Sequence, residues 1–79
     1  MDTTWEGRIA GIFEGYAGGR VYELSDGTRW RQEDRAAEYV YRENARATLR
    51  WEQSIGCWWL DVEGTSGVVR VMPERGTVR

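Results

Sequence analysis

The chain has 79 residues and a net charge of −2, from 11 basic and 13 acidic side chains, and it contains neither histidine nor lysine. This length allows one small domain and excludes two. A single cysteine excludes an internal disulfide, the lack of histidine leaves few metal ligands, and the lack of lysine excludes Schiff-base and P-loop chemistry.

Glycine spacing and residue composition predict an all-β domain. Ten glycines separate short runs rich in Val, Ile, Tyr, Trp and Thr, which is typical of strands joined by turns. The predicted strands are 8–15, 20–24, 28–32, 45–52 and 57–63, with a closing strand at 68–72. Residues 32–43 have a helix-like composition, and we expect at most one helical turn there, at 33–37. Residues 1–6 and 73–79 are expected to be loose termini of a single domain spanning 1–79.

The hairpin within residues 21–31 can be given a register from its sequence. A two-residue loop would set Glu23 opposite Trp30. A three-residue loop at 25–27 instead pairs Tyr22 with Trp30 and sets Glu23 against Arg29. Aromatic pairs and opposite charges across strands are favourable, so the three-residue loop is predicted.

Two later hairpins can be registered in the same way. The predicted pairs are Trp51 with Trp58, Leu49 with Leu60 and Arg50 with Trp59 in the first, and Val62 with Val69, Leu60 with Val71 and Asp61 with Arg70 in the second. Five or six short strands in meander order favour a small closed barrel, because closure removes exposed strand edges.

The order of short motifs along the chain carries a resemblance. The motifs are Gly11-Ile12-Phe13-Glu14-Gly15-Tyr16, Val21-Tyr22-Glu23-Leu24-Ser25-Asp26-Gly27, Trp30-Arg31-Gln32, a segment containing Tyr39 and Tyr41, and Val62-Glu63-Gly64. Their order resembles a group of short uncharacterised bacterial proteins, and the resemblance runs from about Gly7 to Val71. It implies an SH3-like barrel, often encoded on mobile elements such as integron cassettes, and it implies no activity.

The aromatic content exceeds what so small an interior needs. The predicted core residues are Phe13, Tyr22, Leu24, Trp30, Leu49, Trp51, Trp58, Leu60, Val62, Val69 and Val71. The remaining aromatic side chains lie among arginines, and Trp, Tyr and Arg supply most hot spots of protein interfaces. The predicted binding residues are Tyr16, Tyr39, Tyr41, Trp59, Arg50 and Gln32.

These features predict a non-enzymatic interaction module that forms a homo-oligomer or binds another protein, without a cofactor or a metal. Cys57 is expected to be structural, since no histidine can activate it. Asp61 and Glu63 are expected to form a solvated strand face. The unpaired cysteine and the lack of a signal-peptide pattern favour the cytoplasm, with no membrane partner.

Two alternatives stay open at this stage. Aromatic rings interleaved with arginine also suit single-stranded nucleic acid, although the charge lacks the basic excess usual for that class. An enzyme site could instead form at the symmetry axis of an oligomer, with Gln32 as its one indication.

Overall fold

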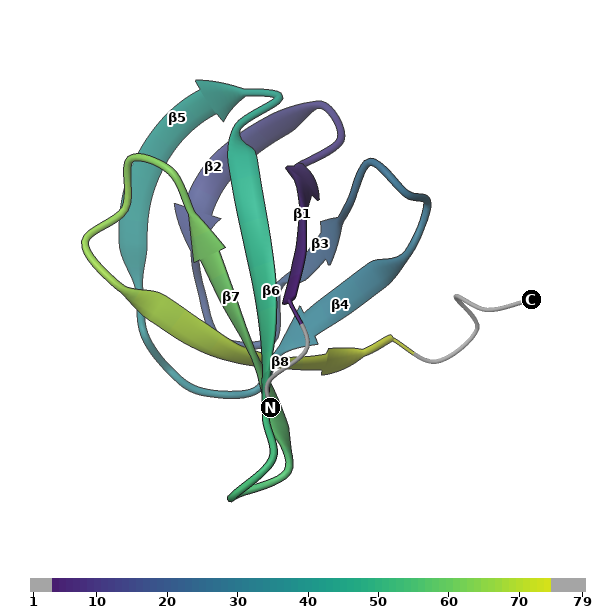
Figure 1. The fold of residues 1–79 in the computed structure, drawn as a ribbon. Coiled ribbons are helices and arrows are strands. Elements are labelled where there is room, and N and C mark those ends of the chain that lie inside the picture. The colour runs from purple at the N-terminus through teal and green to yellow at the C-terminus, as the bar shows by residue number, and fades with distance from the viewer. Residues whose placement is uncertain (1–3, 75–79) are drawn as a thin grey trace.

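The computed structural model describes residues 4–74, which form eight β-strands and no helix. The strands are β1 (Thr4–Arg8), β2 (Ile12–Tyr16), β3 (Val21–Glu23), β4 (Arg29–Gln32), β5 (Glu38–Glu43), β6 (Arg46–Glu52), β7 (Cys57–Val62) and β8 (Val68–Pro73) (Figure 1). The all-β prediction is confirmed. Since residues 4–74 contain no helix, this part of the chain has none that is long and apolar enough to cross a membrane.

The strands form two antiparallel sheets. Six strands lie in the order β1-β6-β7-β8-β4-β3, and β2 pairs separately with β5. The two outer strands of the large sheet meet only just beyond their ends, where Ile9 and Leu24 form an isolated bridge. Within residues 4–74 no continuous ladder joins β1 to β3. The described residues form eight strands in place of the five or six predicted. A single bridge, and no ladder, links the two outer strands of the large sheet in this part of the chain.

The N-terminal segment is strand from residue 4 onward, which corrects the expectation of a loose terminus at residues 4–6. Alternate residues of β1 are half-buried, and Trp5 packs against the core. The predicted strand at 8–15 is divided at Gly11, whose φ of 79° turns the chain between β1 and β2. Asn44 holds this turn, because its side-chain oxygen accepts from the Gly11 amide at 3.2 Å.

β5 was not predicted, because the composition of residues 32–43 resembles that of a helix. No helical turn forms at 33–37. The Asp34 carboxylate instead accepts hydrogen bonds from the Ala36 amide at 3.2 Å and from the Arg70 amide at 2.9 Å, which fixes an extended loop. β5 is then held by antiparallel pairing with β2.

The C-terminal boundary also differs from the prediction. Pro73 belongs to β8, and Glu74 is tied to β4 because its amide donates to the Arg29 carbonyl and its carboxylate pairs with Arg31 at 2.8 Å. The rest of the predicted loose termini, residues 1–3 and 75–79, lies outside the described residues.

Two of the three predicted hairpin registers are confirmed. The pairs of Tyr22 with Trp30 and of Glu23 with Arg29 form as expected, around a loop in which Gly27 has a φ of 90°. The β6–β7 register is also as predicted, with Trp51 opposite Trp58.

The β7–β8 register is wrong by two residues. Leu60 faces Val69, where Val62 was expected to face Val69, and Arg70 lies opposite Trp59. The loop is longer than predicted because the Thr65 hydroxyl donates to the Val62 carbonyl at 2.6 Å and stabilises a wide turn. A shift of two keeps every side chain on its face, so alternation alone cannot detect it.

The core lies between the inner faces of the two sheets. Nine of the eleven predicted core residues are buried, and they are joined there by Ile9, Tyr16, Ala45 and Ala47. Trp51 and Trp58 are half-buried, with their ring centroids 5.3 Å apart. Trp30 stacks edge-on against Trp58 at the same distance, so these three rings cover one end of the core.

Candidate functional site

Tyr16 is a core residue, which corrects its prediction as a surface binding residue. Only 4% of the side chain is exposed. The pairing of β2 with β5 is irregular between Phe13 and Gly15, where two residues of β5 lie opposite the single residue Glu14. The alternation of burial in β2 breaks at this point, at Gly15 with its φ of 116°, so Tyr16 points inward like Phe13. The Tyr16 hydroxyl accepts from the Val62 amide at 3.1 Å and lies 3.0 Å from the Gly67 carbonyl, to which it donates. Tyr16 therefore ties β2 to the β7–β8 loop and is not accessible to a ligand.

Gln32 is also buried, with 1% of its side chain exposed. Its side-chain oxygen accepts from the Tyr22 hydroxyl and from the Ala17 amide at 3.1 Å. Its amide nitrogen donates to the Asp34 carboxylate at 2.8 Å and to the Ala36 carbonyl at 2.7 Å. Because these partners use both ends of the amide, Gln32 serves the fold, and the observation that suggested an enzyme site has a structural explanation.

Burial changes the acidity of the two core tyrosines. Desolvation is the largest cause of a raised pKa for the Tyr22 hydroxyl, which reaches about 12, although the hydrogen bond from Ala17 and the charge of Arg20 oppose it. Desolvation likewise raises the pKa of Tyr16, against the hydrogen bonds from Thr65 and Val62. Both hydroxyls therefore keep their protons in the folded protein at pH values where an unfolded chain loses them.

The domain is expected to lose stability at alkaline pH. The unfolded Tyr22 loses its proton near pH 10, whereas the folded residue keeps it to about pH 12, so the free energy of unfolding is unaffected below pH 10 and falls as the pH rises through 12. The Tyr22 contribution is ~2–3 kcal/mol. Urea unfolding at a series of pH values measures it, and Tyr22→Phe should reduce the slope. An unchanged slope in that variant would contradict the assignment.

The two exposed tyrosines lie on β5 and are separated by one residue. Tyr39 is 76% exposed and Tyr41 53% exposed, and both project from the face of β5 that turns away from the core. Tyr39 lies opposite Gly15, a residue without a side chain, and Ile12 of β2 adds an exposed apolar side chain near the other end of the ribbon. We call Tyr39, Tyr41 and Ile12 the β5 face.

The edge of β5 that points away from β2 is unpaired. β5 pairs with β2 on one side only, and no backbone hydrogen bond within residues 4–74 reaches its other edge. Figure 1 shows β5 at the outside of the fold. The sequence predicted that Tyr39 and Tyr41 are exposed, but it did not predict this edge. The alternation of residues 38–43 is typical of a strand, and the helix-like composition of the segment obscured it.

Arg50 and Trp59 come together on the outer face of the large sheet, as predicted. Arg50 lies opposite Trp59, and Arg70 lies opposite Trp59 on its other side, so one row crosses three strands. The indole nitrogen of Trp59 donates to Glu52 at 2.8 Å, and Arg70 pairs with Glu33 at 3.1 Å. Trp59 is half-buried, whereas Arg50 and Arg70 are exposed. With the carboxylates of Glu52 and Glu33, this row carries charges of both signs.

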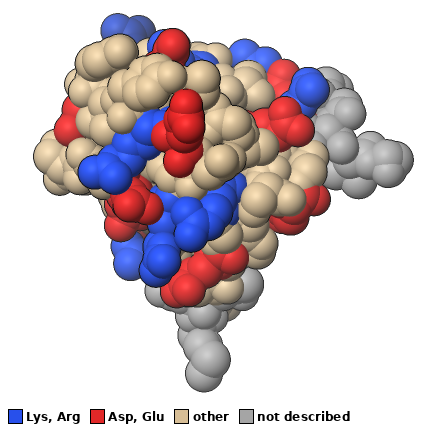
Figure 2. Space-filling view, turned by 90° about the horizontal axis from the view of Figure 1, so that it is seen from above, with Lys and Arg blue, Asp and Glu red and all other residues tan. Residues whose placement is uncertain are grey.

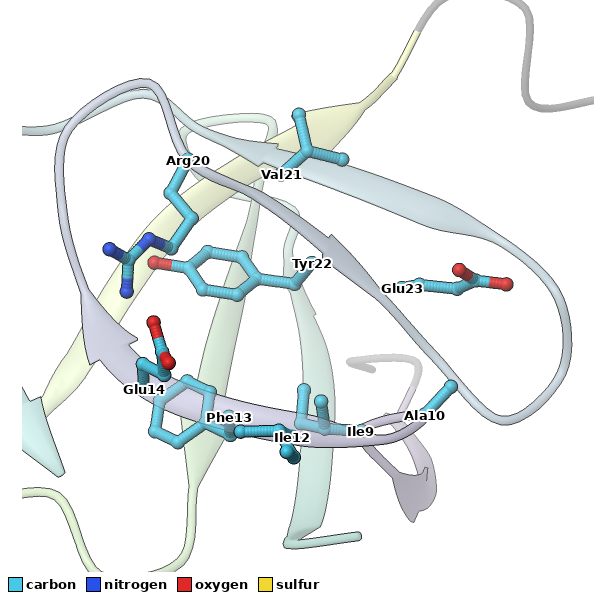
Figure 3. A pocket seen from close by; sticks show the side chains of 9 residues that line it. All are labelled: Ile9, Ala10, Ile12, Phe13, Glu14, Arg20, Val21, Tyr22 and Glu23. Carbon is cyan, nitrogen blue, oxygen red and sulfur yellow. The ribbon is translucent and has the colours of Figure 1, made fainter. Parts of the chain in front are cut away.

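A cavity of about 410 Å³ lies where the sheets separate between β2 and β3. Phe13 and Tyr22 line its floor, and Figure 3 shows the Arg20 guanidinium beside the Tyr22 hydroxyl at one end, with Glu23 at the other. Arg20 already donates to the Gly15 carbonyl at 2.8 Å. This hydrogen bond ties the residue that precedes β3 back to β2 at one end of the cavity.

The remaining polar groups offer little further chemistry. Cys57 is half-buried and unpaired, and residues 4–74 contain no group of three or more acidic or cysteine side chains placed to hold a metal ion. The β5 face and the row through Trp59 are thus the two surfaces that hold the exposed or half-buried members of the predicted binding set. Comparisons with protein-family models, curated proteins and solved structures find no match for this chain.

Proposed function

We propose that the chain is a non-enzymatic interaction module that self-associates through the β5 face. The observation that carries this proposal is Tyr39, whose ring is 76% exposed although it belongs to a paired strand. Tyr41 and Ile12 extend the exposed apolar area along the same ribbon. Tyrosine provides a large rigid contact surface with a polar tip, which is why it is enriched in protein interfaces.

The buried polar groups agree with a binding role. Tyr16 and Gln32 satisfy their hydrogen bonds inside the domain, so the aromatic and polar groups left for a partner are those on the surface. The bridge between Ile9 and Leu24 supports a further proposal, that the strands close as an SH3-like barrel of the kind carried by bacterial mobile elements. We also propose that the module acts in the cytoplasm, where its unpaired Cys57 stays reduced.

Light scattering across micromolar concentrations tests self-association. The wild-type chain is expected to show a mass above that of one chain. Replacing both tyrosines, Tyr39→Ser with Tyr41→Ser, is expected to weaken association by ~100-fold, since each truncated anchor costs about one factor of ten. Ile55→Ser is the matched control, because Ile55 is 60% exposed on the β6–β7 turn, away from β5. A wild-type chain that stays monomeric throughout would overturn the proposal.

Single-stranded nucleic acid is a weaker candidate ligand. The row of Arg50, Trp59 and Arg70 combines an aromatic ring with two guanidinium groups. Trp59 and Arg70 are already bound to carboxylates, however, and Figure 2 shows acidic side chains interspersed with basic ones on the face seen from above. Nucleic-acid surfaces concentrate positive charge, so we do not propose this function.

A further inference from the structure

We propose that the partner at β5 is the β5 strand of a second copy, paired antiparallel about a two-fold axis at Val40. This inference rests on the proposed function and specifies its geometry. The two ribbons would join into one continuous sheet in the order β2-β5-β5-β2. Pairing of exposed strand edges is a common route by which sheets associate.

The free edge of β5 makes this geometry available. The backbone of β5 hydrogen-bonds to β2 alone within the described chain, so the backbone groups on its other side lack protein partners. β5 carries the extra residue of the β-bulge, at Val40 and Tyr41, yet its burial still alternates from Glu38 to Tyr41. An unpaired edge of this kind is a template for another strand. A two-fold axis lets each copy supply the same edge to the other, which closes the assembly at a dimer.

The sequence of β5 selects the register. Directly opposed residues of an antiparallel pair share a face, so a two-fold axis must pass through one residue. With the axis at Val40, Glu38 faces the second copy's Arg42, and Tyr39 faces the second copy's Tyr41. Both pairs occur twice, which makes the edge complementary to itself in charge and in shape.

The neighbouring registers lose this complementarity. An axis at Tyr41 would set Tyr39 against Glu43 and Val40 against Arg42. An axis at Tyr39 would set Val40 against Glu38. Each slipped register places a charge opposite an apolar or aromatic side chain, so cross-strand pair preferences favour the axis at Val40.

Glu38 and Arg42 already have partners within one chain, but both can still bind a second copy. The Glu38 carboxylate accepts hydrogen bonds from the Ser66 amide at 3.1 Å and from its hydroxyl at 3.0 Å. Arg42 pairs with Glu63 at 3.3 Å, and its side chain is 45% exposed. A carboxylate accepts more than two hydrogen bonds and a guanidinium donates five, so both can serve a second copy as well.

A charge-exchange experiment tests the register. Glu38→Arg alone and Arg42→Glu alone each place like charges opposite one another twice, and each variant is expected to self-associate at least ~10-fold more weakly than wild type. In an equimolar mixture of the two variants, every charge at position 38 meets an opposite charge at position 42 of the other copy, so the mixture is expected to recover a dimer. Light scattering measures the mass, and circular dichroism of each variant confirms that it is folded.

Cysteine cross-linking gives an independent reading of the axis. In a Cys57→Ser background, Val40→Cys is expected to form a disulfide dimer on mild oxidation, because opposed residues of an antiparallel pair lie within bridging distance. Tyr41→Cys in the same background is the control and should cross-link far less. Efficient cross-linking of Tyr41→Cys in place of Val40→Cys would overturn the register.

The outcomes separate this inference from the proposed function. If the wild-type chain associates and requires Tyr39 and Tyr41, but the mixture recovers no dimer and Val40→Cys forms none, edge pairing is overturned and the interaction module stands. If the wild-type chain is monomeric, the proposed self-association and the proposed edge pairing are both overturned. Recovery of a dimer in the mixture, with Val40→Cys cross-linking, establishes the geometry.

Discussion

Gly15→Val is expected to lower the free energy of unfolding by ~3–5 kcal/mol, enough to unfold much of a domain of this size. Gly15 has a φ of 116°, which side chains other than hydrogen rarely allow. A Cβ atom there would lie 1.9 Å from the Glu38 carbonyl oxygen and 2.9 Å from the Tyr39 Cα. Both neighbours are backbone atoms of the paired strand, so the β2–β5 ribbon must separate to admit the side chain.

Gly11→Val is the matched control for this prediction. Gly11 also has a positive φ, of 79°, but a Cβ atom there meets nothing within 4 Å. Its cost is therefore backbone strain alone, ~1–2 kcal/mol. Urea unfolding followed by tryptophan fluorescence measures both variants. Equal losses at the two positions would show that strain dominates and that close packing between β2 and β5 does not.

Gln32→Leu is expected to lower the free energy of unfolding by ~3–4 kcal/mol, although leucine is similar in size to glutamine. The change removes the acceptor of the Tyr22 hydroxyl and of the Ala17 amide, and it removes the donor to Asp34 and to the Ala36 carbonyl. Buried polar groups left without partners lose their hydration and gain nothing in exchange.

Gln53→Leu is the control, because it makes the same change on the exposed β6–β7 turn. It should alter the free energy of unfolding by less than ~0.5 kcal/mol. Hydrogen exchange of the Ala17 and Arg70 amides gives a second measurement, since the loops carrying them depend on Gln32 and Asp34. A Gln32→Leu variant as stable as wild type would mean that the network contributes little beyond packing.

Local sequence was enough to predict the β3–β4 hairpin. Its register follows from a three-residue loop and from two cross-strand pairs within eleven residues, and the structure confirms it. The β7–β8 register failed because the Tyr16 hydroxyl and the Thr65 side chain hold a longer loop, and Tyr16 is 46 residues from Val62. No local pattern reveals a hydrogen-bond partner at that separation.

Part of the candidate site was predictable from the aromatic content of the chain. Surplus aromatic content predicted that Tyr39 and Tyr41 lie outside the core, and they are the most exposed aromatic residues of residues 4–74. Tyr16 was misplaced because the alternation of burial in β2 breaks where its pairing with β5 is irregular. Gln32 was misplaced because its role depends on loops that come together only in the folded chain.

The sheet order has a consequence for synthesis of the chain. Within residues 4–74, β1 pairs with β6 alone, and β4 joins the large sheet through β8, the last of the described strands. An emerging chain therefore cannot complete the sheet until β8 has left the ribosome, and contacts between such distant segments form slowly. Completion of the large sheet is therefore expected to wait for the segment that carries β8.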